Sequence, residues 1–160
     1  MVRLQRYTEK NQDFKCLHCH YYVSADAFIA GVNNRNHCPY CLWSRHMDLF
    51  EAGDRLAVCK AEMQPIGLTL KRTRKKYGMA KYGELMLIHL CSDCEKISLN
   101  RIAADDDTEL VYEIYKNSLH LDIRIKTALT KNGIHALGDK DNLIVETQLF
   151  GRLFRNNEFA

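Results

Sequence analysis

Hydrophobic and polar positions repeat regularly at four places in the chain, and each repeat predicts one element. Residues 41–50, CLWSRHMDLF, place Leu42, His46 and Leu49 or Phe50 at the 3.6-residue spacing of a short helix. Residues 105–117, DDDTELVYEIYKN, combine an aspartate or threonine N-cap with one apolar face, which predicts a second helix. Residues 119–126, LHLDIRIK, alternate as a strand does, and residues 143–154, LIVETQLFGRLF, predict a last helix.

The composition is that of a globular protein with one compact domain or two small ones. The chain has 160 residues, of which 46% are hydrophobic and 27% are charged, and it contains only two prolines. No apolar run approaches the roughly 20 residues that span a bilayer, and the N-terminal MVRLQRYTEK has no apolar signal core. We therefore expect a cytoplasmic protein without a membrane partner, with an organellar matrix as the alternative location.

Cys16 and Cys19 form one C-x-x-C pair, and Cys38 and Cys41 form another after a gap of eighteen residues. In a reducing compartment the seven cysteines of the chain indicate metal binding rather than disulfides. Two cysteines three positions apart on a tight knuckle aim both sulfurs at one point, and two knuckles complete a tetrahedron with bonds of about 2.3 Å. The spacing predicts a Cys₄ zinc site of the zinc-ribbon or treble-clef type, with the ligands Cys16, Cys19, Cys38 and Cys41.

The other three cysteines, Cys59, Cys91 and Cys94, are one ligand short of a second closed site. His89 stands two residues before Cys91 and predicts a Cys₃His set, so that the chain would hold two Zn²⁺ ions. His37, His46 or a water are alternatives to His89, and Cys59 could instead be an ordinary buried thiol. A closed site leaves no position for substrate, so both zinc sites are predicted to be structural.

Knuckle, hairpin, second knuckle and helix follow one another in the order of a treble clef. The sequence therefore predicts an α+β fold in which a small zinc-ribbon or treble-clef module with two structural zinc sites, residues 1–107, precedes a short helical domain, residues 108–160. No cysteine follows Cys94, which supports the division.

Arg35-Asn36-His37-Cys38-Pro39 is the signature of the RNHCP domain family, and the chain resembles that family over about residues 12–107. The resemblance implies a zinc-ribbon-like fold with paired metal sites and implies no reaction. The chain departs from it at Ala61 and Glu95, where glycine would ease the turn. Further matching positions are Gly53-Asp54-Arg55, Cys59, Met63, Pro65-Ile66, His89, Cys91, Cys94, Asn100-Arg101-Ile102-Ala103, Asp105 and Asp106.

A weaker resemblance covers about residues 118–157, which look like the helix-hairpin-helix in the C-terminal domain of the RNA polymerase alpha chain. Gly133-Ile134, Leu137-Gly138-Asp139 and Phe150-Gly151-Arg152 carry it, and the chain departs from it at Ala136 and Lys140. It implies that Gly133 ends a helix in the left-handed conformation and that the amides of the next helix bind phosphate. The alternative is an ordinary helical domain that caps the zinc module.

Residues 71–81, KRTRKKYGMAK, contain six of the 23 basic residues and no acid. Such a field attracts polyanions, and the tyrosines among the cations could stack on exposed bases, although a solvated loop is the alternative. The residues predicted to bind nucleic acid are Lys71, Arg72, Arg74, Lys75, Lys76, Tyr77, Lys81 and Tyr82. Arg35, Asn36, Asn100 and Arg101 could extend this surface or make buried hydrogen bonds.

The leading hypothesis is a zinc-stabilised RNA-binding protein that is a component of the ribosome or a factor associated with it, with ribosomal proteins as further partners. DNA or the transcription machinery is the alternative that the polymerase-like segment favours. A protein-interaction adaptor that uses Leu149, Phe150, Leu153 and Phe154 is another. No small-molecule substrate is indicated.

An enzyme is the competing class, a metal-assisted nuclease or hydrolase. Its candidate residues match no catalytic spacing, so we expect no enzymatic activity. They are His37, His46, Asp48, Asp54, Asp105, Asp106 and Asp107.

Overall fold

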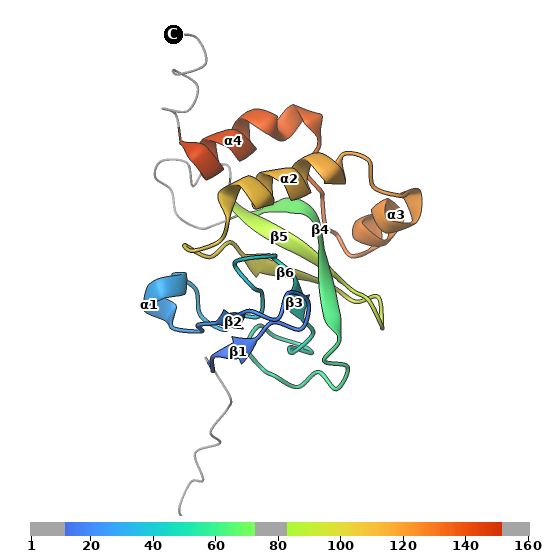
Figure 1. Ribbon diagram of the computed structural model, residues 1–160. Coiled ribbons are helices and arrows are strands. Elements are labelled where there is room, and N and C mark those ends of the chain that lie inside the picture. The colour runs from blue at the N-terminus through green and yellow to red at the C-terminus, as the bar shows by residue number, and fades with distance from the viewer. Residues whose placement is uncertain (1–11, 73–82, 152–160) are drawn as a thin grey trace, which may run out of the picture.

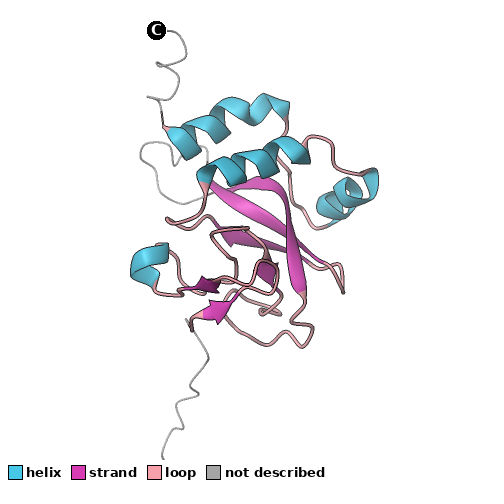
Figure 2. Cartoon of the chain, viewed as in Figure 1, coloured by secondary structure: helices cyan, strands magenta, loops and turns pink. Residues whose placement is uncertain are grey.

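The computed structural model describes residues 12–72 and 83–151. A four-stranded antiparallel sheet forms its centre, with three helices packed around one end and a cysteine-rich segment at the other (Figure 1). The strands are β1 Phe14–Lys15, β2 Tyr22–Val23, β3 Ser44–Arg45, β4 Glu62–Lys71, β5 Glu84–Cys91 and β6 Ile97–Arg101. The helices are α1 Ala27–Ala30, α2 Thr108–Ser118, α3 Ile123–Lys131 and α4 Asn142–Phe150, with a 3₁₀ turn at Asp139–Asp141 (Figure 2).

The long β4–β5 ribbon organises the sheet. The strand order is β3-β4-β5-β6, and β4 and β5 pair from Met63 opposite Cys91 to Lys71 opposite Glu84, with a bulge between Pro65 and Gly67. Because β4 and β5 are long and largely apolar, they bury both of their faces. β1 and β2 form a separate two-stranded ribbon.

Neighbouring residues of β5 pack against different helices because side chains alternate between the two faces of a sheet. Leu87 lies in one core cluster with Leu68 of β4 and Tyr115 of α2. The next residue, Ile88, lies in a second cluster with Leu129 of α3. Leu87 and Ile88 therefore belong to two different core clusters, one that includes α2 and one that includes α3.

Helix α2 confirms the helix predicted at residues 105–117. The Asp107 side chain accepts a hydrogen bond from the backbone N–H of Leu110 and caps the helix. The helix comes so close to β4 that a Cβ added at Gly67 would lie 3.1 Å from the Cβ of Ser118. A larger residue at position 67 would require the helix to shift by a few tenths of an ångström.

The helix predicted at residues 41–50 is wrong, and so is the treble-clef order. Leu42 has a φ of 62°, which ends the preceding knuckle and turns the chain into β3. Ser44 and Arg45 then pair with β4, opposite Met63 and Glu62. The backbone hydrogen bonds of this pairing outweigh the helical spacing of the apolar residues.

The strand predicted at residues 119–126 is also wrong, because α3 begins inside it. The Asp122 side chain accepts a hydrogen bond from the N–H of Arg124 at 2.7 Å and caps the helix. Leu121, Ile125 and Leu129 recur every four residues and pack against the same core cluster. The alternation at residues 119–126 therefore belongs to a capped helix.

The helix-hairpin-helix prediction is not confirmed, although Gly133 ends α3 with a φ of 68° as that resemblance implies. The segment after Gly133 follows β4 instead of forming a tight hairpin, since the N–H of Leu137 donates to the carbonyl of Leu68. Helix α4 packs against α2, away from α3 (Figure 1). Of the four apolar residues considered for an adaptor surface, Leu149 contacts the core and the Phe150 ring meets the Tyr112 ring edge-on, so the chain itself covers these two. Leu153 and Phe154 lie outside the described residues.

One core cluster contains side chains from both sides of the predicted boundary at residues 107 and 108. Leu42 and Leu68 precede the boundary, and Val111, Tyr115 and Val145 follow it. The division into two domains stays a prediction. Within residues 12–72 and 83–151, no helix is long and apolar enough to cross a membrane.

The shared core leads to a stability prediction. Leu68→Ala should lower the free energy of unfolding by about 2–5 kcal/mol, because this leucine is fully buried between β5 and α2. Leu143→Ala, on the half-exposed side of α4, is the matched control and should change it by less than about 0.5 kcal/mol. Urea denaturation followed by circular dichroism measures both, and equal effects would contradict the packing described.

Candidate metal centres

Three C-x-x-C knuckles in the chain have the same backbone structure. In each, the N–H of the first cysteine donates to the carbonyl five residues later, and the N–H of the residue after the second cysteine donates back to the first cysteine. That residue has a positive φ, 66° at His20, 62° at Leu42 and 62° at Glu95. The knuckles occupy residues 16–20, 38–42 and 91–95.

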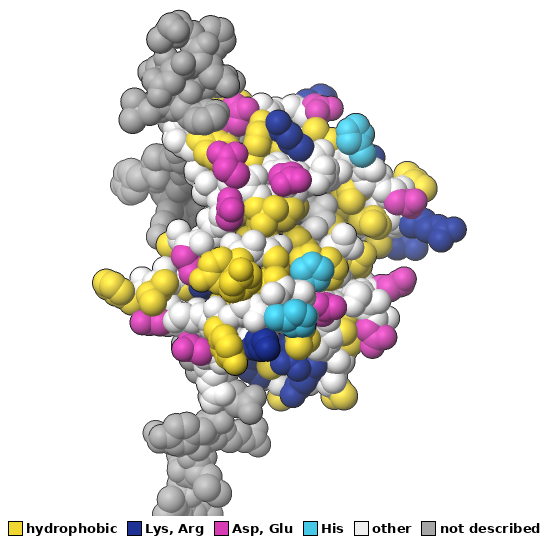
Figure 3. All heavy atoms as spheres, viewed as in Figure 1, with side chains coloured by type: hydrophobic (Ala, Val, Ile, Leu, Met, Phe, Trp, Pro, Cys, Tyr) yellow, Lys and Arg dark blue, Asp and Glu magenta, His cyan; other side chains and the backbone are white. Residues whose placement is uncertain are grey.

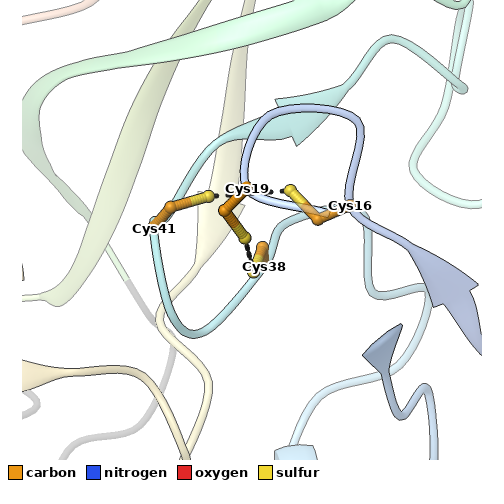
Figure 4. A group of neighbouring side chains, drawn as sticks. All are labelled: Cys16, Cys19, Cys38 and Cys41. Atoms are coloured by element: carbon orange, nitrogen blue, oxygen red, sulfur yellow. Dashed lines mark hydrogen bonds between the residues drawn. The ribbon is translucent and has the colours of Figure 1, made fainter. Parts of the chain in front are cut away.

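The first two knuckles face each other and form the first metal group, Cys16, Cys19, Cys38 and Cys41 (Figure 4). The Sγ atoms of Cys16 and Cys41 are 3.6 Å apart, as are those of Cys19 and Cys38. Tetrahedral bonds of about 2.3 Å to one ion would put two sulfurs about 3.8 Å apart. These distances are far longer than the roughly 2.05 Å of a disulfide, so the four sulfurs fit around one metal ion.

The thiols of the first metal group compete for protons. A hydrogen bond from Cys41 lowers the pKa of Cys38 to about 5, although burial opposes the shift. The same contact, together with burial, raises the pKa of Cys41. Metal binding requires thiolates, so an ion entering this group would displace protons.

The second metal group consists of His46, Cys59, Cys91 and Cys94, and the register of the sheet assembles it. Beyond the end of the β3–β4 pairing, the N–H of His46 donates to the carbonyl of Ala61, which brings His46 close to Cys59. The pairing of Met63 with Cys91 then places the third knuckle beside both residues.

The distances in the second metal group also suit one ion. The Sγ atoms of Cys59 and Cys91 are 3.6 Å apart, and the Sγ of Cys94 is 3.3 Å from the Nδ1 of His46. Burial, the largest effect, lowers the pKa of His46 and favours the neutral imidazole that binds metals. Each group can therefore hold one metal ion, and the second is the more exposed, because Cys94 lies at the surface.

The prediction of His89 as the eighth ligand is wrong, and His46, one of the alternatives, takes that place. The Nε2 of His89 lies 2.7 Å from the carbonyl of Leu42, and Asn100 donates its amide to Nδ1 at 2.9 Å. Both ring nitrogens are thus occupied in a fully buried site, where burial lowers the pKa of His89 to about 3. His89 is a neutral core residue that ties the second knuckle to β5 and β6.

Arg35 and His37 of the signature pentapeptide connect the second knuckle to the start of α2. The Arg35 guanidinium donates two hydrogen bonds to Asp105, at 2.8 and 2.9 Å, and lies 3.4 Å from Asp106. The Nε2 of His37 lies 2.7 Å from Asp106, which also accepts the backbone N–H of Ala103. We call these four residues, Arg35, His37, Asp105 and Asp106, the signature clasp. The side chains of Arg35 and Asp106 have no solvent-exposed area, whereas that of Asp105 is 31% exposed, so the clasp is internal except at Asp105.

Asn36 of the signature pentapeptide and Asp54 of the Gly53-Asp54-Arg55 motif hold the loop before Cys59 in place by hydrogen bonds. Asn36 donates to Asp48 at 2.9 Å and accepts from Arg55. The Asp54 carboxylate accepts four backbone N–H groups, and these hydrogen bonds hold its pKa well below the ordinary value. The backbone donors belong to Leu49, Phe50, Glu51 and Leu56.

The seven catalytic candidates do not all meet in the described part of the chain, although His37, His46 and Asp48 line one pocket. His37, Asp105 and Asp106 belong to the signature clasp, and Asp107 caps α2. His46 belongs to the second metal group, whereas Asp48 and Asp54 accept hydrogen bonds within the loop before Cys59. Each of the seven therefore has a structural partner.

Only two of the predicted nucleic-acid residues lie within the described part of the chain. Lys71 and Arg72 are exposed at the end of β4. Among the four residues considered as extensions of that surface, only Arg101 is exposed, and it pairs with Glu84 at 2.8 Å. Arg35, Asn36 and Asn100 make the internal contacts described above. The others, Arg74, Lys75, Lys76, Tyr77, Lys81 and Tyr82, lie outside the described residues.

Three exposed tyrosines at the first metal group were not predicted from the sequence. They are Tyr21, Tyr22 and Tyr40. Their positions in the sequence could have indicated them, because Tyr40 lies inside the second C-x-x-C pair and the other two follow the first pair within three residues.

Comparison with known proteins identifies the family of the chain. The family model described as the RNHCP domain matches residues 11–112, well over half of the chain. No curated protein and no solved structure matches. The matched segment contains both metal groups and all of the signature clasp, and its description names a domain and no reaction. The chain belongs to the RNHCP domain family.

Proposed function

We propose that this protein is a zinc-stabilised nucleic-acid-binding protein whose principal contact with phosphates is the basic segment of residues 71–82. The observation that carries the proposal is the charge of this segment, six cations and no acid within residues 71–81. Tyr77 and Tyr82 add aromatic rings to the cations.

The donor sets of the two metal groups support zinc as the metal. Four thiolates, or three thiolates and one imidazole, are the ligand sets of structural zinc sites. Four protein ligands fill a tetrahedral zinc, so neither ion has a free position for substrate or activated water. Two zinc ions per chain would therefore stabilise the fold, and the surface would do the binding.

The attachment of the basic segment supports a role in binding. Lys71 is the first residue of the segment, and Glu84 comes two residues after its last. These two residues are paired neighbours at the end of the β4–β5 ribbon. The second metal group lies at the other end of this ribbon, about 25 Å away at roughly 3.3 Å per residue. The basic segment is thus attached to the sheet far from the second metal group.

RNA, and the ribosome in particular, is the favoured target. Small zinc-stabilised scaffolds with basic extensions resemble ribosomal proteins, which is an argument from analogy. The competing target is duplex DNA, and a direct comparison of binding to RNA and DNA decides between them.

A salt titration tests the proposal. If three phosphates are contacted, the logarithm of the binding constant for single-stranded RNA should fall with the logarithm of the salt concentration with a slope of about −2. Arg74→Gln, Lys75→Gln and Lys76→Gln together should flatten this slope and weaken binding. Fluorescence anisotropy with a labelled 12-nucleotide RNA measures both quantities.

A second triple variant controls for net charge. Arg124→Gln, Lys126→Gln and Lys131→Gln remove three exposed cations from α3 and change the charge by the same amount. Binding by this variant should retain the salt slope of the original protein. A salt-independent affinity, or equal losses in both triple variants, would contradict the basic segment as the principal contact.

A further inference from the structure

Three exposed tyrosine rings at the first metal group form what we call the aromatic platform, Tyr21, Tyr22 and Tyr40. Their exposed fractions are 64%, 78% and 59%. The rings of Tyr21 and Tyr40 come from different knuckles, yet their centroids are 5.2 Å apart with an interplanar angle of 45°. Within the described residues no hydrogen bond engages their hydroxyl groups. More than half of the area of each of these residues is exposed to solvent.

The first metal group holds the aromatic platform in place. The carbonyl of Tyr21 accepts the N–H of Cys16, and Tyr40 lies between Cys38 and Cys41. Tyr22 follows on β2, opposite Lys15. Because the backbone of all three rings is fixed by ligand cysteines or strand pairing, little conformational entropy remains to be lost on binding.

One cation lies directly against the aromatic platform. The Nζ of Lys15 lies 5.9 Å from the centre of the Tyr22 ring. The His18 ring stacks on Trp43 at 3.9 Å and contacts Glu62, the strand partner of Arg45. On the face shown in Figure 3, Lys and Arg side chains gather over the region of β1 and β3 beside histidines, whereas acids predominate over α2. Lys15 thus adds a positive charge beside one of the three rings.

We propose that the aromatic platform binds single-stranded nucleic acid by stacking unpaired bases on its rings, while the adjacent Lys15 contacts a phosphate. This inference rests on the proposed function and adds a second contact surface, away from the basic segment. Every base has a π-face, so stacking tolerates any sequence but requires that the bases be unpaired.

The chemistry of the platform favours nucleic acid over a protein partner. Aromatic rings also occur at the centres of protein interfaces, but lysine is depleted there. Here Lys15 lies against one of the rings, where a phosphate beside a stacked base could reach it.

Binding of a labelled 12-nucleotide oligouridylate to the full chain tests the inference. Tyr21→Ala and Tyr40→Ala should each raise the dissociation constant by about 5-fold to 150-fold, the range for one stacked base. Tyr21→Phe and Tyr40→Phe should retain most of the affinity, because they keep the rings. Phe28→Ala is the matched control, since Phe28 on α1 is 95% exposed and lies outside the platform. This variant should bind as the original protein does.

The salt slope distinguishes the two proposals. Tyrosine variants should shift the affinity without changing the slope, because they remove no charge. If the original protein binds with the expected slope and the alanine variants bind equally well, the platform proposal fails alone. Tyr→Phe losses as large as Tyr→Ala losses would also overturn it, as would equal affinity for the matching duplex. If the original protein binds no oligonucleotide at low salt, the proposed function fails and this inference fails with it.

Discussion

If each metal group holds one zinc ion, as proposed, His46→Ala should reduce the zinc content from two ions per chain to about one. This change removes the one nitrogen ligand of the second metal group and leaves three cysteines, whereas the first metal group keeps all four of its sulfurs. His89→Gln should retain two ions, because His89 donates to Leu42 and accepts from Asn100 inside the core. Elemental analysis after dialysis against a chelator gives the zinc count for each variant.

A conservative replacement provides the control. His46→Cys keeps a donor close to the same point and turns the second metal group into a Cys₄ set, so it should again hold two ions. If His46→Ala kept two ions and His89→Gln kept one, the ligand assignment would be reversed. If His46→Cys held only one, loss of folding rather than loss of a ligand would explain the alanine result.

Arg35→Ala should lower the free energy of unfolding by about 3–5 kcal/mol, the cost of removing one partner from a buried ion pair. The Arg35 side chain is inaccessible to solvent, and its removal leaves the equally inaccessible Asp106 without its guanidinium partner. Two more guanidinium bonds, to the carbonyls of Ser24 and His37, would also be lost. Arg35→Lys should recover only part of the loss, since an ammonium cannot make the bidentate bond to Asp105.

Arg101→Ala is the control for Arg35. Arg101 also pairs with a carboxylate, that of Glu84, but its side chain is 56% exposed, so the cost should stay below about 1 kcal/mol. Chemical denaturation of zinc-loaded protein measures both variants. An Arg35→Ala cost as small as that of Arg101→Ala would show that the signature clasp does not stabilise the fold.

The sequence predicts the first metal group correctly because its chemistry is local. A C-x-x-C pair folds into a knuckle through bonds within six residues, so spacing alone identifies Cys16, Cys19, Cys38 and Cys41. The same holds for α2, whose cap and apolar face lie within one segment. Membership of the family is likewise visible in contiguous motifs.

The errors arise where partners are distant in the chain. The choice between His46 and His89 depends on which strand residues pair, since the β3–β4 register carries His46 to Cys59 while β5 turns His89 into the core. Strand β3 has only two residues, Ser44 and Arg45, and is too short to show an alternating pattern. The apolar positions of residues 119–126 fit the spacing of a strand and also that of a helix. The N-cap at Asp122 favours the helix.

The order of the ligands along the chain has a consequence for biosynthesis. All four sulfurs of the first metal group lie within residues 16–41, whereas the second group needs residues from 46 to 94. The first ion can therefore be captured while β4 and β5 are still being made, and the second only after Cys94 has emerged. A nascent chain that stalls before that point would carry one loaded centre and one unfinished one.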